Sequence, residues 1–234
     1  MRSPHTALVN RLLCVAALLL AGAAGAFGQA TRIVSANEFF AALIAHYAGI
    51  KTYEATIGIK QDTAVSTGRL SYKAPNLLNV RFDSPAGEVL NFDGKRLDVT
   101  VPSQKVVLEQ DYKTVPDDQL AGIATAGALA VLRTQYSVAY LTGPDPVPLD
   151  KDTPDLVIKL KLVARASTSF SDMIMSVKDQ MVRRVEATLA NGASMVVDFT
   201  SVKPNAAVPD NRFVFVPPGD YTAVKNWLYD PSKQ

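Results

Sequence analysis

Apolar and polar residues alternate along much of the chain between residues 53 and 202, with the period of two that is typical of half-buried β-strands. The alternation is clearest over residues 53–60, 69–73, 78–82, 97–101 and 156–163, and further apolar stretches occupy 136–141, 170–178, 182–189 and 193–202. We therefore predict about ten or eleven strands, each with one face turned toward a core.

Short turn sequences separate these stretches, namely Ala74-Pro75-Asn76, Ser84-Pro85-Ala86-Gly87, Asp93-Gly94, Pro102-Ser103, Asp179-Gln180 and Asn191-Gly192. We predict a two-residue hairpin at Asp93-Gly94 and a type I′ hairpin turn at Asn191-Gly192. Because connections this short join antiparallel neighbours, the sheet is expected to be antiparallel.

Two segments have helical rather than strand periodicity. Ser35 and Glu38 have the spacing of a capping box, and Gly49 follows as a C-cap. The apolar positions between them recur at helical spacing, at Phe39, Phe40, Leu43, Ile44 and Tyr47.

The second helical segment contains no charged residue from Gln119 to Leu132, and Asp117 or Asp118 can cap it after Pro116. A helix that is apolar on all sides must be covered by other parts of the protein. We therefore predict a mainly β (α+β) fold, a half-open, curved antiparallel β-barrel with helices covering its concave face.

The N-terminus has the features of an export signal. Arg2 and Arg11 precede the apolar stretch Leu12–Leu20, and small residues allow cleavage near Ala26 or Ala30. We predict that residues 1–30 are a signal peptide and that residues 31–234 form a single domain in the periplasm. The alternative is an uncleaved anchor, but the apolar stretch is shorter than the roughly 20 residues that a spanning helix needs.

Removal of this segment changes the interpretation of charge and cysteine content. The whole chain has 24 Lys and Arg against 22 Asp and Glu, and the first 30 residues carry two arginines and no acid, which leaves 22 of each. A net-neutral chain gives no reason to expect nucleic acid as a partner. The single cysteine, Cys14, lies in the discarded segment, so we expect neither a disulfide framework nor a cysteine metal site.

The chain offers little catalytic chemistry. His46 is the only histidine after residue 30, and no nucleophile, metal-binding or nucleotide-binding motif accompanies it. Asp117-Asp118 fits helix capping, and we interpret Arg183-Arg184 as a solvated strand position rather than an anion site. We predict no enzyme activity, no cofactor and no metal. A hydrolase of an unfamiliar type would need a convergent polar cluster.

The order of motifs resembles the bacterial outer-membrane lipoprotein carrier family, the LolA-like proteins, over about residues 35–224. Three stretches carry the resemblance: Gly68-Arg69-Leu70-Ser71-Tyr72-Lys73-Ala74-Pro75-Asn76, then Val89-Leu90-x-Phe92-Asp93-Gly94-Lys95-x-Leu97, and finally Asn205-Ala206-x-Val208-Pro209-Asp210-x-x-Phe213-x-Phe215-x-Pro217-Pro218-Gly219. No single stretch is specific, and the order of all three carries the assignment.

The resemblance implies an incomplete barrel with helices as a lid over an apolar cavity. It also implies transfer of acylated lipoproteins from an inner-membrane ABC transporter toward an outer-membrane acceptor. Better-known members carry an arginine just before the proline, which holds the lid shut, but this chain has Ala74 there. Arg69 or Arg81 is a candidate replacement for that latch.

Together, pattern and resemblance predict a monomeric carrier that shelters acyl chains of lipoproteins or lipids. The family also includes stress-sensing domains, so a sensor or scaffold that binds a protein partner is the alternative. Met195 adds adaptability to the apolar wall. The candidate cavity residues are Phe40, Leu43, Ile57, Ile59, Leu70, Tyr72, Val80, Phe82, Leu90, Phe92, Leu97, Val99, Ile123, Leu129, Leu132, Leu160, Met173 and Met175.

Overall fold

The structure is a computed structural model, and it describes residues 34–112, 125–168 and 170–227. The described chain from Val34 onward belongs to one compact unit. The predicted signal peptide with its cleavage sites, the caps at Asp117 or Asp118, and Ile123 all lie outside these residues.

Both described α-helices begin at a side-chain cap. Helix α2 spans Ala36–Ala48, and the predicted capping box of Ser35 and Glu38 is present at its start. Helix α3 spans Ala126–Gln135, where Thr125 accepts a hydrogen bond from the Ala128 N–H. Each cap satisfies backbone donors that have no partner inside the first helical turn.

The strands follow the predicted alternation closely. Among the residues that the structure describes there are thirteen, with bounds β1 Thr52–Gln61, β2 Ala64–Lys73, β3 Leu77–Ser84, β4 Val89–Phe92, β5 Arg96–Val101, β6 Val106–Asp111, β7 Tyr136–Tyr140, β8 Val147–Pro148, β9 Leu156–Ala164, β10 Phe170–Lys178, β11 Met181–Leu189, β12 Ser194–Pro204 and β13 Thr222–Lys225. Two short 3₁₀ helices, η1 Pro102–Gln104 and η2 Asp210–Phe213, lie between strands.

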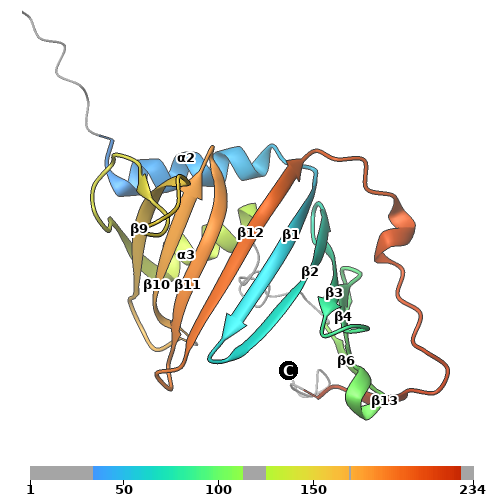
Figure 1. Ribbon diagram of the computed structural model, residues 1–234. Helices are drawn as coiled ribbons and strands as arrows, with labels where there is room; N and C mark the ends of the chain where they lie inside the picture. Colours follow the sequence, from blue (N-terminus) through green and yellow to red (C-terminus); the bar gives the residue numbers. More distant parts are fainter. Residues whose placement is uncertain (1–33, 113–124, 169, 228–234) are drawn as a thin grey trace, which may run out of the picture. The chain divides into compact units, whose positions relative to one another are not determined.

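The strands form one curved sheet in the order β13-β6-β5-β4-β3-β2-β1-β12-β11-β10-β9-β7, and β8 pairs with β9 (Figure 1). The pairing is antiparallel except where β13 lies parallel to β6. Helices α2 and α3 lie on the same, concave side of the sheet (Figure 1). The predicted fold class, a mainly β, half-open barrel with helices over its concave face, is confirmed.

Strand register defines the face of the sheet that the helices cover, which we call the inner face. Its first row runs Tyr53, Tyr72, Leu78, Phe92 and Leu97 across five neighbouring strands. A second row runs Ala55, Leu70, Val80, Leu90, Val99 and Leu108. The same face continues through β12 to β7, where Phe199, Met175 and Leu160 belong to the buried core together with Phe40 of α2.

Two of the predicted turns differ in detail from the sequence interpretation. In the β4–β5 hairpin the turn residues are Gly94 and Lys95, because the Asp93 N–H bonds to the Arg96 carbonyl and Gly94 has φ of +93°. The Asp93 carboxylate accepts the N–H groups of Lys95 and Arg96 and so occupies the position before the turn.

The β11–β12 hairpin is present, but its predicted type I′ turn is wrong. Gly192 has φ of +87°, whereas Asn191 is not among the described residues with positive φ. The Gly192 N–H bonds to the Leu189 carbonyl, which is the pattern of a longer loop that ends in a left-handed glycine.

Replacement of Gly68 by alanine tests the close approach of β2 and β3. A Cβ at Gly68 would lie 2.5 Å from the Arg81 carbonyl oxygen, so we expect Gly68→Ala to lower the free energy of unfolding by about 1–3 kcal/mol. The matched control is Gly127→Ala in α3, where a Cβ meets nothing within 4 Å and helix propensity favours alanine. Urea unfolding that shows equal effects for both variants would contradict the packing argument.

Candidate functional site: the apolar inner face

All described candidates for the apolar cavity lie together. The strand residues share the inner face by register. All of them except Val99 belong to or pack against one apolar core, which also contains Phe40, Leu43, Leu129 and Leu132 of the two helices. Position on this face is therefore as expected from the alternation, while a role in ligand binding stays a prediction.

The candidates differ in how far they are buried. Most belong to closed core, with Phe40, Phe92 and Leu160 at 0% exposure. The buried set is Phe40, Leu43, Ile57, Leu70, Tyr72, Val80, Phe92, Leu129, Leu132, Leu160, Met173 and Met175. Ile59 and Met195 are half-buried. A further group over β3–β6, which we call the open patch, is also only half-buried and consists of Phe82, Leu90, Leu97, Val99 and Leu108.

Leu108 is a member of the open patch that the sequence analysis does not identify. It lies in β6, which the alternation does not predict, because Val106, Val107 and Leu108 form a continuous apolar run. The sequence carries no signal that places Leu108 on the inner face, and only the strand register shows it opposite Val99.

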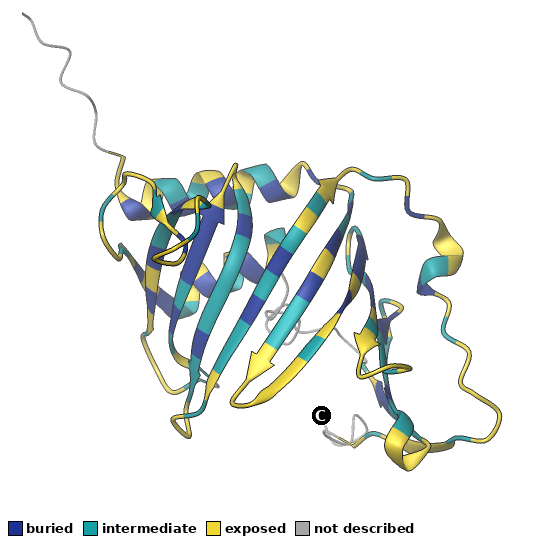
Figure 2. Cartoon of the chain, viewed as in Figure 1, coloured by how far each residue is buried: buried dark blue, intermediate teal, exposed yellow. Residues whose placement is uncertain are grey.

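Exposure over β5 is the reverse of what the alternation predicts (Figure 2 colours the chain by burial). The polar residues on its outer face are buried, with Asp98 at 1% and Thr100 at 3% exposure, while Leu97 and Val99 on the inner face are only half-buried. In β4 the polar Asn91 of the outer face is buried as completely as Phe92 of the inner face, both at 0% exposure. The expectation that the polar positions of these strands face solvent is wrong. The physical reason lies in contacts from distant parts of the chain.

The C-terminal segment supplies one of these contacts. After β12 the chain passes outside β3–β6, and the Asn91 amide donates to the Phe213 carbonyl at 3.1 Å and Asn79 donates to Asn91 at 2.8 Å (Figure 1). Asp98 is paired with Arg96 at 2.8 Å, yet burial still raises the pKa of the Asp98 carboxyl. Polar groups on the outer face therefore hold the segment in place, and the apolar surface faces inward.

Three tyrosines gather where α2 leads into β1. The ring centroids of Tyr53 and Tyr72 are 5.2 Å apart, and the Tyr72 hydroxyl donates to the Pro75 carbonyl at 2.9 Å. The Tyr47 hydroxyl accepts the Val182 N–H at 2.9 Å, and burial raises the pKa of Tyr47 to about 12. The sequence predicts Tyr47 as a periodic apolar position of the helix and Tyr72 as a cavity residue, but the polar contacts of these tyrosines are not visible in it.

Tyr47 and Tyr140 attach the two ends of α2 to the sheet. Pairing between β11 and β12 ends at Arg184 and Asp198, so the Val182 N–H lies beyond the last paired residues and bonds to Tyr47 instead. At the other end, the Tyr140 hydroxyl donates to the Val34 carbonyl at 3.0 Å, and its ring contacts Phe39. These contacts hold the helix over the inner face.

The suggested latch through Arg69 or Arg81 is wrong. The two arginines are register partners on the outer face, opposite to the helices. Arg69 bonds to Asp83 at 3.0 Å, and the Arg81 Nε donates to Asn79 at 3.2 Å. Neither side chain is on the face where a contact with α2 can form.

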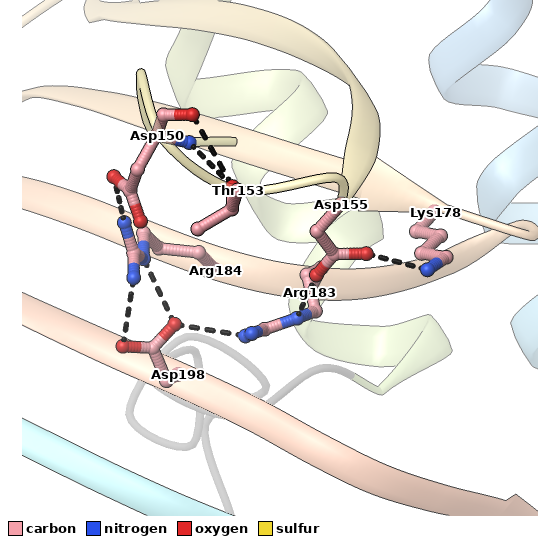
Figure 3. A network of polar contacts seen from close by, with 7 residues as sticks. All are labelled: Asp150, Thr153, Asp155, Lys178, Arg183, Arg184 and Asp198. Atoms are coloured by element: carbon pink, nitrogen blue, oxygen red, sulfur yellow. Dashed lines mark hydrogen bonds and ion pairs between the residues drawn. The ribbon is translucent and has the colours of Figure 1, made fainter. Parts of the chain in front are cut away.

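Arg183 and Arg184 form part of an ion-pair network on the outer face (Figure 3). A bulge lets both residues reach Asp198, Arg183 at 2.9 Å and Arg184 at 2.8 Å. Arg183 also bonds to Asp155, and Arg184 to Asp150. The interpretation of this pair as one solvated position is therefore wrong, and its charges are matched by carboxylates of the chain itself.

A cleft of about 420 Å³ lies in the fork where β11 and β12 separate. Val182 and Phe199 contribute its apolar lining, and Lys178, Arg183 and Asp155 contribute charged groups. Because an acyl chain would desolvate these charged groups and offer them no polar contact, the cleft is a poor match for an acyl chain.

The described residues contain little that could support catalysis or metal binding. His46 is half-buried on α2 beside the Tyr47 ring, with ring centroids 6.3 Å apart. Within residues 34–112, 125–168 and 170–227, no group of three or more His, Cys, Asp or Glu side chains could hold a metal ion. In the same part of the chain, no helix has the length and apolar character to cross a membrane.

Replacement of Tyr47 by phenylalanine tests the attachment of α2. The Val182 N–H would lose its partner while buried, so we expect the free energy of unfolding to fall by about 1–3 kcal/mol. Tyr140→Phe is the matched control at the other end of the helix, where water can replace the lost hydroxyl, and should cost less than about 1 kcal/mol. A larger loss for Tyr140→Phe in urea unfolding would contradict this account.

The ion-pair network predicts a pH dependence. Hydrogen bonds from Lys178, and then from Arg183, lower the pKa of Asp155. Its stabilisation is therefore complete above the usual pKa of about 4 and is lost as the pH falls through the lowered value. The stability difference between wild type and Asp155→Asn should shrink as urea titrations move below pH ~4. Asp152→Asn, an exposed change in the same loop, is the control, and a pH-independent difference for Asp155→Asn would refute the prediction.

Alignment with one solved structure supports the fold, and two further alignments are weaker. An uncharacterized conserved protein from Thermus thermophilus aligns with a TM-score of 0.52 at 12% identity, over 80% of this chain and 96% of that one. Mycobacterium tuberculosis lipoprotein LppX aligns with a TM-score of 0.44 at 10% identity, over 73% of this chain and 97% of that one. The Pseudomonas aeruginosa MucA/MucB complex gives 0.44 at 12% identity, over 81% and 63%.

Comparison by sequence identifies the family. No curated protein matches the chain. Residues 55–216, however, match the family described as "Outer membrane lipoprotein carrier protein LolA", and this range extends from β1 into the C-terminal segment. The match covers well over half of the chain and confirms the resemblance carried by the sequence motifs. The chain therefore belongs to the outer membrane lipoprotein carrier protein LolA family.

Proposed function

We propose that this protein is a periplasmic carrier that shelters acyl chains of lipoproteins or lipids on its inner face. The observation that carries the proposal is the reversed exposure of β5. There the chain buries Asp98 and Thr100 on the outer face and leaves Leu97 and Val99 of the inner face only half-buried. A stable apolar surface of this kind on a concave face favours an apolar ligand.

The energetics of such a ligand agree with this arrangement. Burial of an acyl chain contributes about 0.8 kcal/mol per methylene, or about 11 kcal/mol for roughly 14 methylenes. Contact with the open patch supplies this free energy without any catalytic group. The half-buried Met195, on the same inner face, can repack around ligands of different shape because methionine is unbranched and flexible.

The rest of the transport route follows from family membership and the N-terminal signal. We propose export to the periplasm with removal of residues 1–30, and a single carrier domain that works as a monomer. Its donor would be an inner-membrane ABC transporter and its recipient an outer-membrane acceptor. Because no metal or catalytic group is needed for this exchange, we propose that the protein is not an enzyme.

Native mass spectrometry of the protein purified from a membrane-containing host tests the proposal. The expected result is a bound mass in the lipid or lipopeptide range. A clean protein mass that also takes up no palmitoyl lipid or acylated peptide when these are offered would contradict it. That outcome would favour a sensor or scaffold that binds a protein partner.

A pair of variants tests the location of the ligand. Val99→Asp places a carboxylate in the open patch, and because contact with an acyl chain would desolvate this charge, uptake of a palmitoyl phospholipid should weaken at least tenfold. Val163→Asp is the matched control, because Val163 is 42% exposed on the outer face of β9. Equal effects in a fluorescence displacement assay would place the ligand elsewhere, provided that circular dichroism shows both variants folded.

A further inference from the structure

Polar side chains of the inner face over β1–β6 lie in its first row and again beyond the third row, where Ser66 pairs with Ile59. The first row, next to the turns at residues 74–76 and 94–95, carries Tyr53, Tyr72 and Gln110. The next rows carry only apolar side chains and Gly68, namely Ala55, Leu70, Val80, Leu90, Val99 and Leu108, and then Ile57, Gly68 and Phe82. The inner face is thus polar at the rim and apolar over the two rows that follow.

Tyr53 differs from the other two polar residues of this row. The Tyr72 hydroxyl donates to the Pro75 carbonyl, and the Gln110 amide donates to the Asp111 carbonyl at 3.1 Å. Tyr53 is 2% exposed, and its hydroxyl has no hydrogen-bond partner within the part of the chain that the structure describes. A buried hydroxyl without a partner is destabilising relative to phenylalanine, so its presence calls for a partner of another kind.

We propose that the Tyr53 hydroxyl donates a hydrogen bond to the carbonyl oxygen of a bound acyl ester or amide. This inference rests on the proposed function and names the polar part of its ligand. An acylated ligand has the same order of groups as the inner face, a carbonyl followed by a long apolar chain. With the carbonyl at Tyr53 in the first row, the chain extends over the apolar rows toward the open patch.

The assignment makes Tyr53 a specificity residue. A pocket that offers a buried donor rejects an analogue that cannot accept its hydrogen bond, because the donor is then left unpaired. Ether lipids have the same chains as ester lipids but lack the carbonyl, so they isolate this one contact. Tyr72, whose ring lies beside Tyr53 and whose hydroxyl already has a partner, provides the matched control.

The test compares binding of dipalmitoyl phosphatidylglycerol and its dihexadecyl ether analogue to wild type, Tyr53→Phe and Tyr72→Phe. Wild type should bind the ester about fivefold more tightly, equivalent to about 1 kcal/mol. Tyr53→Phe should bind both lipids with the affinity of the ether, and Tyr72→Phe should keep the preference. The same comparison with a diacylglyceryl-cysteine peptide and its ether analogue distinguishes a lipoprotein from a free phospholipid as the source of the ester.

Each of the following results would overturn the assignment. If wild type shows no preference for the ester, or if Tyr53→Phe keeps that preference, the hydrogen bond from Tyr53 is excluded. As long as both lipids still bind, either result leaves the proposed carrier function intact. A loss of stability in Tyr53→Phe together with an unchanged preference shows that the hydroxyl serves an internal water. Failure of wild type to bind either lipid or either peptide removes the proposed function and this assignment with it.

Discussion

A long sheet with one apolar face must bury that face, and two short helices cover only part of it. In this protein α2 and α3 pack against β7 and the neighbouring strands, where Leu160, Met175 and Phe199 form closed core with Phe40. Over β3–β6 the same face continues, but the five side chains of the open patch are only half-buried. The fold therefore holds a closed core and an accessible apolar surface on one continuous sheet, and this division is the basis of the proposed carrier function.

The outer face explains why the exposed apolar surface can persist. Paired and hydrogen-bonded polar groups, among them Asn91 with the Phe213 carbonyl and Arg184 with Asp150, hold other segments against the back of the sheet. These contacts are directional, so they hold the strands in position, and the apolar residues of the inner face take no part in them. A ligand that is itself apolar can then enter and leave without loss of the contacts that maintain the sheet.

The sequence predicts the fold well because strand periodicity is a local property. Alternation alone places Ile57, Leu70 and Val80 on one face, and the capping box at Ser35 locates the start of α2. Exposure is not local: Asn91 is buried partly through a residue 122 positions away, which no pattern around Asn91 encodes. For the same reason the bulge that brings Arg183 and Arg184 to one carboxylate, and the missing partner of Tyr53, become visible only in three dimensions.

Photo-crosslinking with a palmitoyl lipid that carries a diazirine at the end of its chain tests the central claim most directly. If acyl chains lie on the inner face, peptide mass spectrometry should find the label on Phe82, Leu90, Leu97, Val99 or Leu108. Label concentrated on outer-face or C-terminal side chains, such as Val163 or Val216, would contradict the claim, because these residues lie outside the inner face.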